Sequence, residues 1–142
     1  MPIYPPQGPR DKARYDSLKS EEREYGMFCI EFCSMILERR PDQLEALEVA
    51  ANQCTELGYF ADGLSLDERL LRLRPDDPGV LYNIACSQAL VGRVDDALLS
   101  LSRSVLNGYR NHRHMARDRD LDSLHGDVRF HELLAGMKSR SP

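Results

Sequence analysis

Two prolines that stand 34 residues apart constrain the fold of this chain more than any other feature. Pro41 and Pro75 each follow an arginine and precede an aspartate, and Gly58 and Gly92 are separated by the same interval. Proline cannot continue a helix, and glycine readily takes the left-handed conformation that ends one. The sequence therefore predicts a helix–turn–helix unit that recurs every 34 residues.

The segments between these breaks carry apolar residues at helical spacing. The predicted helices span residues 20–39, 43–57, 60–73, 78–91 and 94–106. Ser20 is the expected N-cap of the first helix. That helix carries an apolar stripe, which consists of Phe28, Cys29, Phe32, Cys33, Ile36 and Leu37. No segment alternates apolar and polar residues as a strand does, so we expect an all-α fold of antiparallel neighbouring helices.

The composition excludes several classes of protein. Hydrophobic residues make up 42% of the 142 residues and charged residues 30%, which is typical of a globular domain. A net charge of −4 gives no reason to expect a nucleic-acid partner. No run of 18 apolar residues predicts a membrane span, and MPIYPPQGPR lacks the apolar stretch of a signal peptide. With four cysteines inside apolar helical patterns, we expect reduced, buried thiols and a cytoplasmic location.

Aligning residues 44–77 with residues 78–111 places small residues on small ones and large residues on large ones. The matched pairs are Ala51 with Ala85, Gly58 with Gly92, Phe60 with Val94, Gly63 with Ala97, Leu64 with Leu98 and Leu71 with Val105. This pattern resembles the tetratricopeptide repeat (TPR) family, whose unit is a 34-residue helix–turn–helix, and YNIACSQALVGRVDDALLSL is the best match. The chain departs from the family at Asp67, where a large apolar residue is usual, at Ser104, where alanine is usual, and at Tyr109 in place of proline.

The resemblance implies a right-handed superhelical α–α stack of about seven helices. Its domain would span residues 20–138. The parts are a half repeat at 20–43, full repeats at 44–77 and 78–111, and a C-terminal cap at 112–138, with a tail at 139–142. Residues 1–19 begin with four prolines and are expected to form an extended or disordered arm.

The cap is predicted to close the open end of the last repeat, because solenoid ends need such covering. The expected covering residues are Val128, Phe130, Leu133 and Leu134. The run from Asp118 to Phe130 resembles a closing segment found after bacterial TPR arrays, which favours a bacterial source.

The first helices of stacked TPR units line a concave groove that takes extended peptides. The residues expected to face that groove are Glu48, Asn52, Thr55, Asn83 and Gln88. Together with Arg113 and Arg117, the two asparagines resemble the carboxylate clamp of chaperone-binding TPR domains. Glu48 stands where that clamp has a lysine and would repel a carboxylate, so a polar peptide groove without a clamp is the alternative.

Other chemistry has weaker support in the sequence. Three aspartates mimic the opening of a calcium loop, namely Asp118, Asp120 and Asp122, but Ser123 and Arg129 occupy the positions that need glycine and glutamate. We expect these aspartates to cap helix ends. No nucleophile elbow or phosphate-binding glycine loop is present. The sequence therefore predicts no catalytic residue, no metal and no cofactor.

The predicted function is non-catalytic protein–protein interaction with a protein or peptide partner. One alternative is a secretion-type chaperone, which would bind an extended effector segment and dimerise through its N-terminal helices. Another is a self-associating scaffold, in which the stripe of helix 20–39 meets a second copy to form a homodimer. Residues 110–119 carry four arginines and could dock an acidic partner, and the N-terminal arm could occupy the groove of its own chain or a neighbour.

Overall fold

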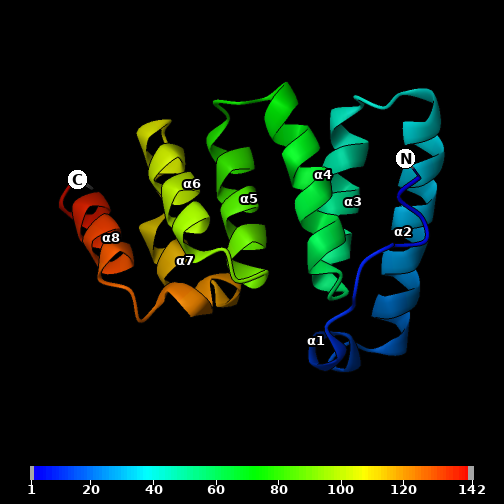
Figure 1. Ribbon diagram of the computed structural model, residues 1–142, viewed down its shortest axis with the longest axis horizontal. Helices are drawn as coiled ribbons and strands as arrows, with labels where there is room; N and C mark the ends of the chain where they lie inside the picture. The colour runs from blue at the N-terminus through cyan, green and yellow to red at the C-terminus, as the bar shows by residue number, and fades with distance from the viewer. Residues whose placement is uncertain (1, 141–142) are drawn as a thin grey trace. The chain divides into compact units, whose positions relative to one another are not determined.

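The computed structural model describes residues 2–140, and within that range the chain is helical with no strand. The prediction of an all-α fold is confirmed. The described residues form eight α-helices and one 3₁₀-helix, rather than about seven helices. The chain divides into two compact units, Met1–Leu73 and Arg74–Pro142, whose elements are labelled in Figure 1.

The first unit contains α1 (Lys12–Asp16), α2 (Ser20–Arg39), α3 (Leu44–Glu56) and α4 (Phe60–Leu73). Helix α3 packs against both α2 and α4. The close approach of α2 depends on Gly26, because an added Cβ there would lie 2.9 Å from the Leu57 side chain. Ser20 is the first helical residue of α2 and not its N-cap, and the Glu22 carboxylate accepts the Lys19 N–H at 2.9 Å.

The apolar stripe predicted for α2 divides between two faces. Cys33 is buried as expected, together with Ile30 and Leu37. Phe28 and Phe32 are exposed. The helix carries apolar residues on opposite sides, and α3 covers only one of them.

The second unit contains α5 (Pro78–Leu90), α6 (Val94–Leu106), α7 (His112–Arg117), η1 (Arg119–Leu124) and α8 (Val128–Arg140). Helices α5 and α6 form a hairpin, and η1 and α8 pack against it. Phe130, Met115 and Met137 join the core from the C-terminal segment, and Leu133 and Leu134 pack against its edge. Val128, which we predicted to cover the core, is exposed.

The 34-residue period seen in the sequence recurs in the backbone. Gly58 and Gly92 take φ values of 92° and 85°, the left-handed conformation that the turn requires. The residues after them close the same hydrogen bond, because Tyr59 N–H donates to the Cys54 carbonyl and Arg93 N–H to the Gln88 carbonyl, both at 2.8 Å. These bonds satisfy carbonyls that the helix end leaves unpaired.

Two arginine contacts repeat with the same period. The Arg69 guanidinium donates to the carbonyl of Pro41 at 2.8 Å, and Arg103 donates to the carbonyl of Pro75 at 3.3 Å. Each contact ties the second helix of a repeat to the proline that stands just before the first helix of the same repeat. The period therefore extends from sequence to matched side-chain geometry.

Ser104 explains one departure from the TPR pattern. Its side chain is fully buried, and its hydroxyl donates to the Pro78 carbonyl at 2.7 Å. The hydroxyl thus joins α6 to the first turn of α5, which an alanine at this position could not do.

The N-terminal arm differs from the entirely extended or disordered segment that was predicted. Asp11 caps a short helix, α1, by accepting the Arg14 N–H at 2.8 Å. Upstream, the Asp62 carboxylate of α4 accepts the N–H groups of Gln7 and Gly8 at 2.8 and 3.0 Å. The arm therefore runs against α4, and the hypothesis that it occupies a peptide groove of its own chain or a neighbour stays a prediction.

No helix within residues 2–140 combines the length and the apolar character that crossing a bilayer requires.

Candidate functional site

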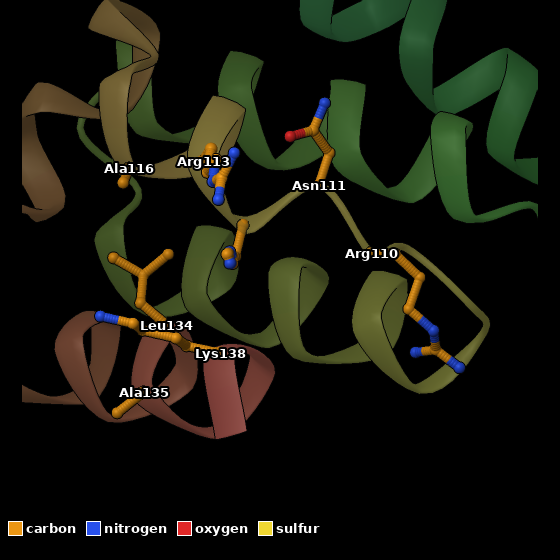
Figure 2. A pocket seen from close by; sticks show the side chains of 8 residues that line it. Arg110, Asn111, Arg113, Ala116, Leu134, Ala135 and Lys138 are labelled. Atoms are coloured by element: carbon orange, nitrogen blue, oxygen red, sulfur yellow. The ribbon is translucent and has the colours of Figure 1, made fainter. Parts of the chain in front are cut away.

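The second unit contains a cavity of about 670 Å³ between α7 and α8, a size typical of ligand sites. Its lining residues are Arg110, Asn111, His112, Arg113, Ala116, Leu134, Ala135 and Lys138. Figure 2 shows Arg113 and Ala116 on α7, and Leu134, Ala135 and Lys138 on α8. The cavity thus has an apolar wall with cationic side chains around it.

Local sequence signals position the two helices that form the cavity. Asn111 caps α7, since its side-chain oxygen accepts the His114 N–H at 3.1 Å. Met115 is fully buried and fixes α7 to the core, while Phe130 and Met137 fix α8. Because these buried residues face the core, Arg113 and Lys138 remain exposed to solvent where they line the cavity.

Within residues 2–140, the side chains that line the cavity are basic, polar or apolar, and none is acidic. Among residues 2–140, Arg113 and Lys138 take part in none of the ion pairs or side-chain hydrogen bonds found for this unit. The His112 Nε2 atom is buried and has no hydrogen-bond partner within the described chain. Such a site favours an anionic ligand that also presents an apolar group.

The structure separates the two arginines that were predicted to act together in the C-terminal segment. Arg113 lines the cavity, whereas Arg117 is exposed and does not line it. The sequence signal that could have indicated the cavity was the basic run RNHRHMARDR. Lys138 was missed, and Leu134 was predicted only as a cap residue, because only the packing of α8 against α7 brings the two to that run.

The other predicted groove residues have differing environments. Glu48 and Asn52 are exposed on α3, and Asn83 is half-buried on α5. Gln88 is buried, and its side-chain oxygen accepts the Ser100 hydroxyl at 2.7 Å. Because that contact fastens α5 to α6, the prediction that Gln88 faces a partner has to be corrected.

Thr55 also serves the packing of its own unit. Its Oγ1 atom occupies the space where a Cβ on Gly63 would lie, so it packs between α3 and α4. The carboxylate clamp needs Asn52 from the first unit together with Asn83, Arg113 and Arg117 from the second, and it stays a prediction.

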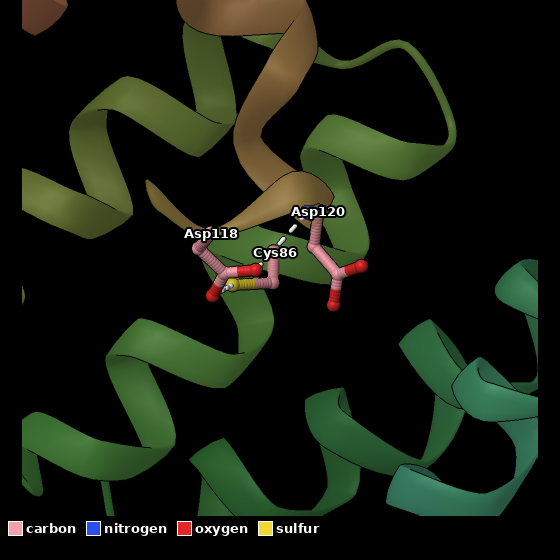
Figure 3. Close-up of side chains that lie close together, drawn as sticks. All are labelled: Cys86, Asp118 and Asp120. Atoms are coloured by element: carbon pink, nitrogen blue, oxygen red, sulfur yellow. Dashed lines mark hydrogen bonds between the residues drawn. The ribbon is translucent and has the colours of Figure 1, made fainter. Parts of the chain in front are cut away.

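A second cluster of polar side chains surrounds Asp118. The Oδ2 atom of Asp118 accepts the Tyr82 hydroxyl at 2.7 Å, lies 3.7 Å from the Cys86 thiol and lies 3.3 Å from His114 Nε2. Its Oδ1 atom accepts the Asp120 N–H at 3.0 Å, which confirms the prediction that it caps a helix end. Figure 3 shows Cys86, Asp118 and Asp120 together.

The ligand-type atoms of Cys86, Asp118 and Asp120 all lie within 4.8 Å of one another, which is close enough for a metal ion. Burial raises the pKa of the Cys86 thiol, and the two carboxylates raise it further. The hydrogen bond between Tyr82 and Asp118 joins α5 to the start of η1.

The chain matches no protein-family model, and no curated protein matches it.

Proposed function

We propose that this chain is a non-catalytic protein-interaction module of TPR type, which binds an acidic segment of a partner in the cavity between α7 and α8. The repeated glycine turns and arginine contacts support the TPR assignment. The observation that carries the binding proposal is the set of cations beside an apolar wall, for which residues 2–140 provide no acidic neighbour in the cavity.

The chemistry of the cavity defines the expected ligand. The Arg113 guanidinium offers a planar fork of donors that matches a carboxylate, and the Lys138 ammonium adds a second positive charge. Arg110 extends away from the α8 side chains in Figure 2, so we assign the anion to Arg113 and Lys138. Leu134 and Ala135 would contact an apolar side chain next to the carboxylate. The ligand class is therefore a peptide with an acidic residue beside an apolar one.

Fluorescence anisotropy tests the proposal with two labelled probes of equal length, one made of glutamate and leucine and the other of lysine and leucine. We expect only the acidic peptide to bind. Arg113→Glu should weaken its binding about tenfold or more, since hydrogen bonds to a charged group contribute about 1.5–3 kcal/mol. Lys138→Glu should act in the same direction.

Arg117→Glu is the matched control, because it makes the same charge change on α7 outside the cavity. We expect this variant to bind the acidic peptide nearly as the wild type does. Equal losses in Arg117→Glu and Arg113→Glu would show that binding follows net charge alone and would refute the assignment to the cavity.

A further inference from the structure

Helix α2 presents a row of large apolar side chains that nothing in the described chain covers. Tyr25, Phe28, Phe32 and Met35 are 63%, 61%, 53% and 62% exposed. The rings of Phe28 and Phe32 stack on each other with centroids 6.1 Å apart. The buried residues of α2, among them Ile30, face the opposite side toward α3. We name the exposed set of four the α2 stripe.

A charged residue lies beyond each end of the α2 stripe, and it continues the helical spacing of the stripe. Glu21 precedes Tyr25 by four positions and Arg39 follows Met35 by four, so the row runs at alternating intervals of four and three. This is the spacing of a seam between two paired helices. The row is also symmetric about residue 30: Glu21 mirrors Arg39, Tyr25 mirrors Met35 and Phe28 mirrors Phe32.

We propose that α2 pairs antiparallel with α2 of a second copy of this chain, around a twofold axis near residue 30. In that arrangement Phe28 contacts Phe32 of the other copy, and Tyr25 contacts its Met35. Each Glu21 meets an Arg39, so opposite charges close both ends of the seam. A parallel pair would instead place like charges together at each end.

The available area suits a modest dimer. Fully buried aromatic side chains remove about 150–250 Å² each from water. At the observed exposures, the α2 stripe offers roughly 450 Å² per copy, or about 900 Å² for the pair. Half-buried Cys29 and Ile36 flank the stripe and add to this area. The total reaches the ~1,000 Å² expected of a specific contact and lies at the weak, transient end of that class.

A row of glutamates beside the α2 stripe makes the two candidate partners, a second copy of the chain and a basic amphipathic helix, respond differently to salt. Glu24, Glu31 and Glu38 are seven residues apart and follow the same edge of the seam. In the antiparallel dimer these rows face each other, and the two Glu21–Arg39 contacts offset part of their repulsion. Salt screens both the repulsion between the glutamate rows and the attraction between Glu21 and Arg39, and it strengthens the burial of apolar surface. Dimerisation should therefore persist at high salt, whereas binding of a basic amphipathic helix would weaken.

Sedimentation velocity and light scattering of the full chain test the proposal over a range of concentrations at low and high salt. We expect a reversible monomer–dimer equilibrium that the variant Phe28→Glu/Phe32→Glu shifts to monomer. Because both side chains are exposed, the variant should retain the circular dichroism of the wild type. Leu99→Glu is the matched control, since Leu99 is 62% exposed on α6 and outside the stripe, and it should remain dimeric.

Charge reversal tests the antiparallel direction. Glu21→Arg alone and Arg39→Glu alone should each weaken the dimer several-fold, and the double exchange should restore it. A wild type that stays monomeric at millimolar concentration, or a dimer that Phe28→Glu/Phe32→Glu leaves intact, would overturn the proposal. Capture of a basic amphipathic peptide by a monomeric chain would also overturn it and assign the stripe to another partner.

Discussion

The same substitution to alanine at Gly58 and at Gly92 tests how strongly the N-terminal arm packs against the turn at Gly58. Both occupy the same turn of the repeat with nearly the same φ. A Cβ added at Gly92 would meet nothing within 4 Å, whereas one added at Gly58 would lie 2.7 Å from the Asp11 carbonyl oxygen. The same substitution to alanine therefore imposes the same backbone strain at both sites but displaces a neighbour at only one.

The expected magnitudes follow from these contacts. A left-handed alanine costs about 1–2 kcal/mol relative to glycine, and this is the full expected cost of Gly92→Ala. Gly58→Ala also disrupts the 2.8 Å hydrogen bond from Asp11 N–H to the Gly58 carbonyl, which is worth about 1 kcal/mol. It also forces the arm away from the turn. We expect Gly58→Ala to destabilise its unit by about 3 kcal/mol.

Urea unfolding read by pulsed hydrogen exchange gives the free energy of unfolding of each unit separately. The control is a chain that lacks residues 2–11, in which Gly58→Ala should cost no more than Gly92→Ala does in the full chain. Equal costs for the two substitutions in the full chain would refute the reasoning, because they would mean that the arm does not press on the turn.

Three further predictions follow from single buried groups. Phe130→Ala should destabilise the unit Arg74–Pro142 by about 3–5 kcal/mol in the same unfolding experiment, since Phe130 is buried in its core. Ser104→Ala should cost the same unit about 1 kcal/mol by removing the hydrogen bond to Pro78, and a Ser104→Ala chain of unchanged stability would contradict that role. Burial, with smaller contributions from the charges of Asp62 and Asp67, raises the pKa of Cys54 to about 12 from 9.0. The unfolded thiol ionises first, so unit Met1–Leu73 should lose stability as pH rises from 9 toward 12, and Cys54→Ala should flatten that decline in urea titrations at each pH.

The sequence predicted the features whose signals are local. A proline, a glycine and a helical apolar pattern act over a few residues, so the helix bounds at 60–73 and 94–106 match the structure. The left-handed turns at Gly58 and Gly92 were predictable for the same reason. The internal repeat strengthened these signals because each occurred twice.

Features that depend on distant contacts could not be predicted in the same way. The periodicity of α2 is apolar on two faces, and the pattern does not say which face a neighbour covers, so the exposure of Phe28 and Phe32 could not be predicted. Gln88 has the polarity of a groove residue, yet Ser100 from α6 provides a buried partner for it. The cavity requires Lys138 to approach α7, and nothing near Lys138 in the chain indicates that approach.

Selection from a displayed library of random peptides tests the central claim most directly, because it does not assume the ligand. The proposal predicts that the wild type enriches peptides with an acidic residue beside an apolar one, and that Arg113→Glu/Lys138→Glu loses this enrichment while Arg117→Glu retains it. Enrichment of peptides without acidic residues, or an unchanged profile in the double variant, would contradict binding at the cavity between α7 and α8.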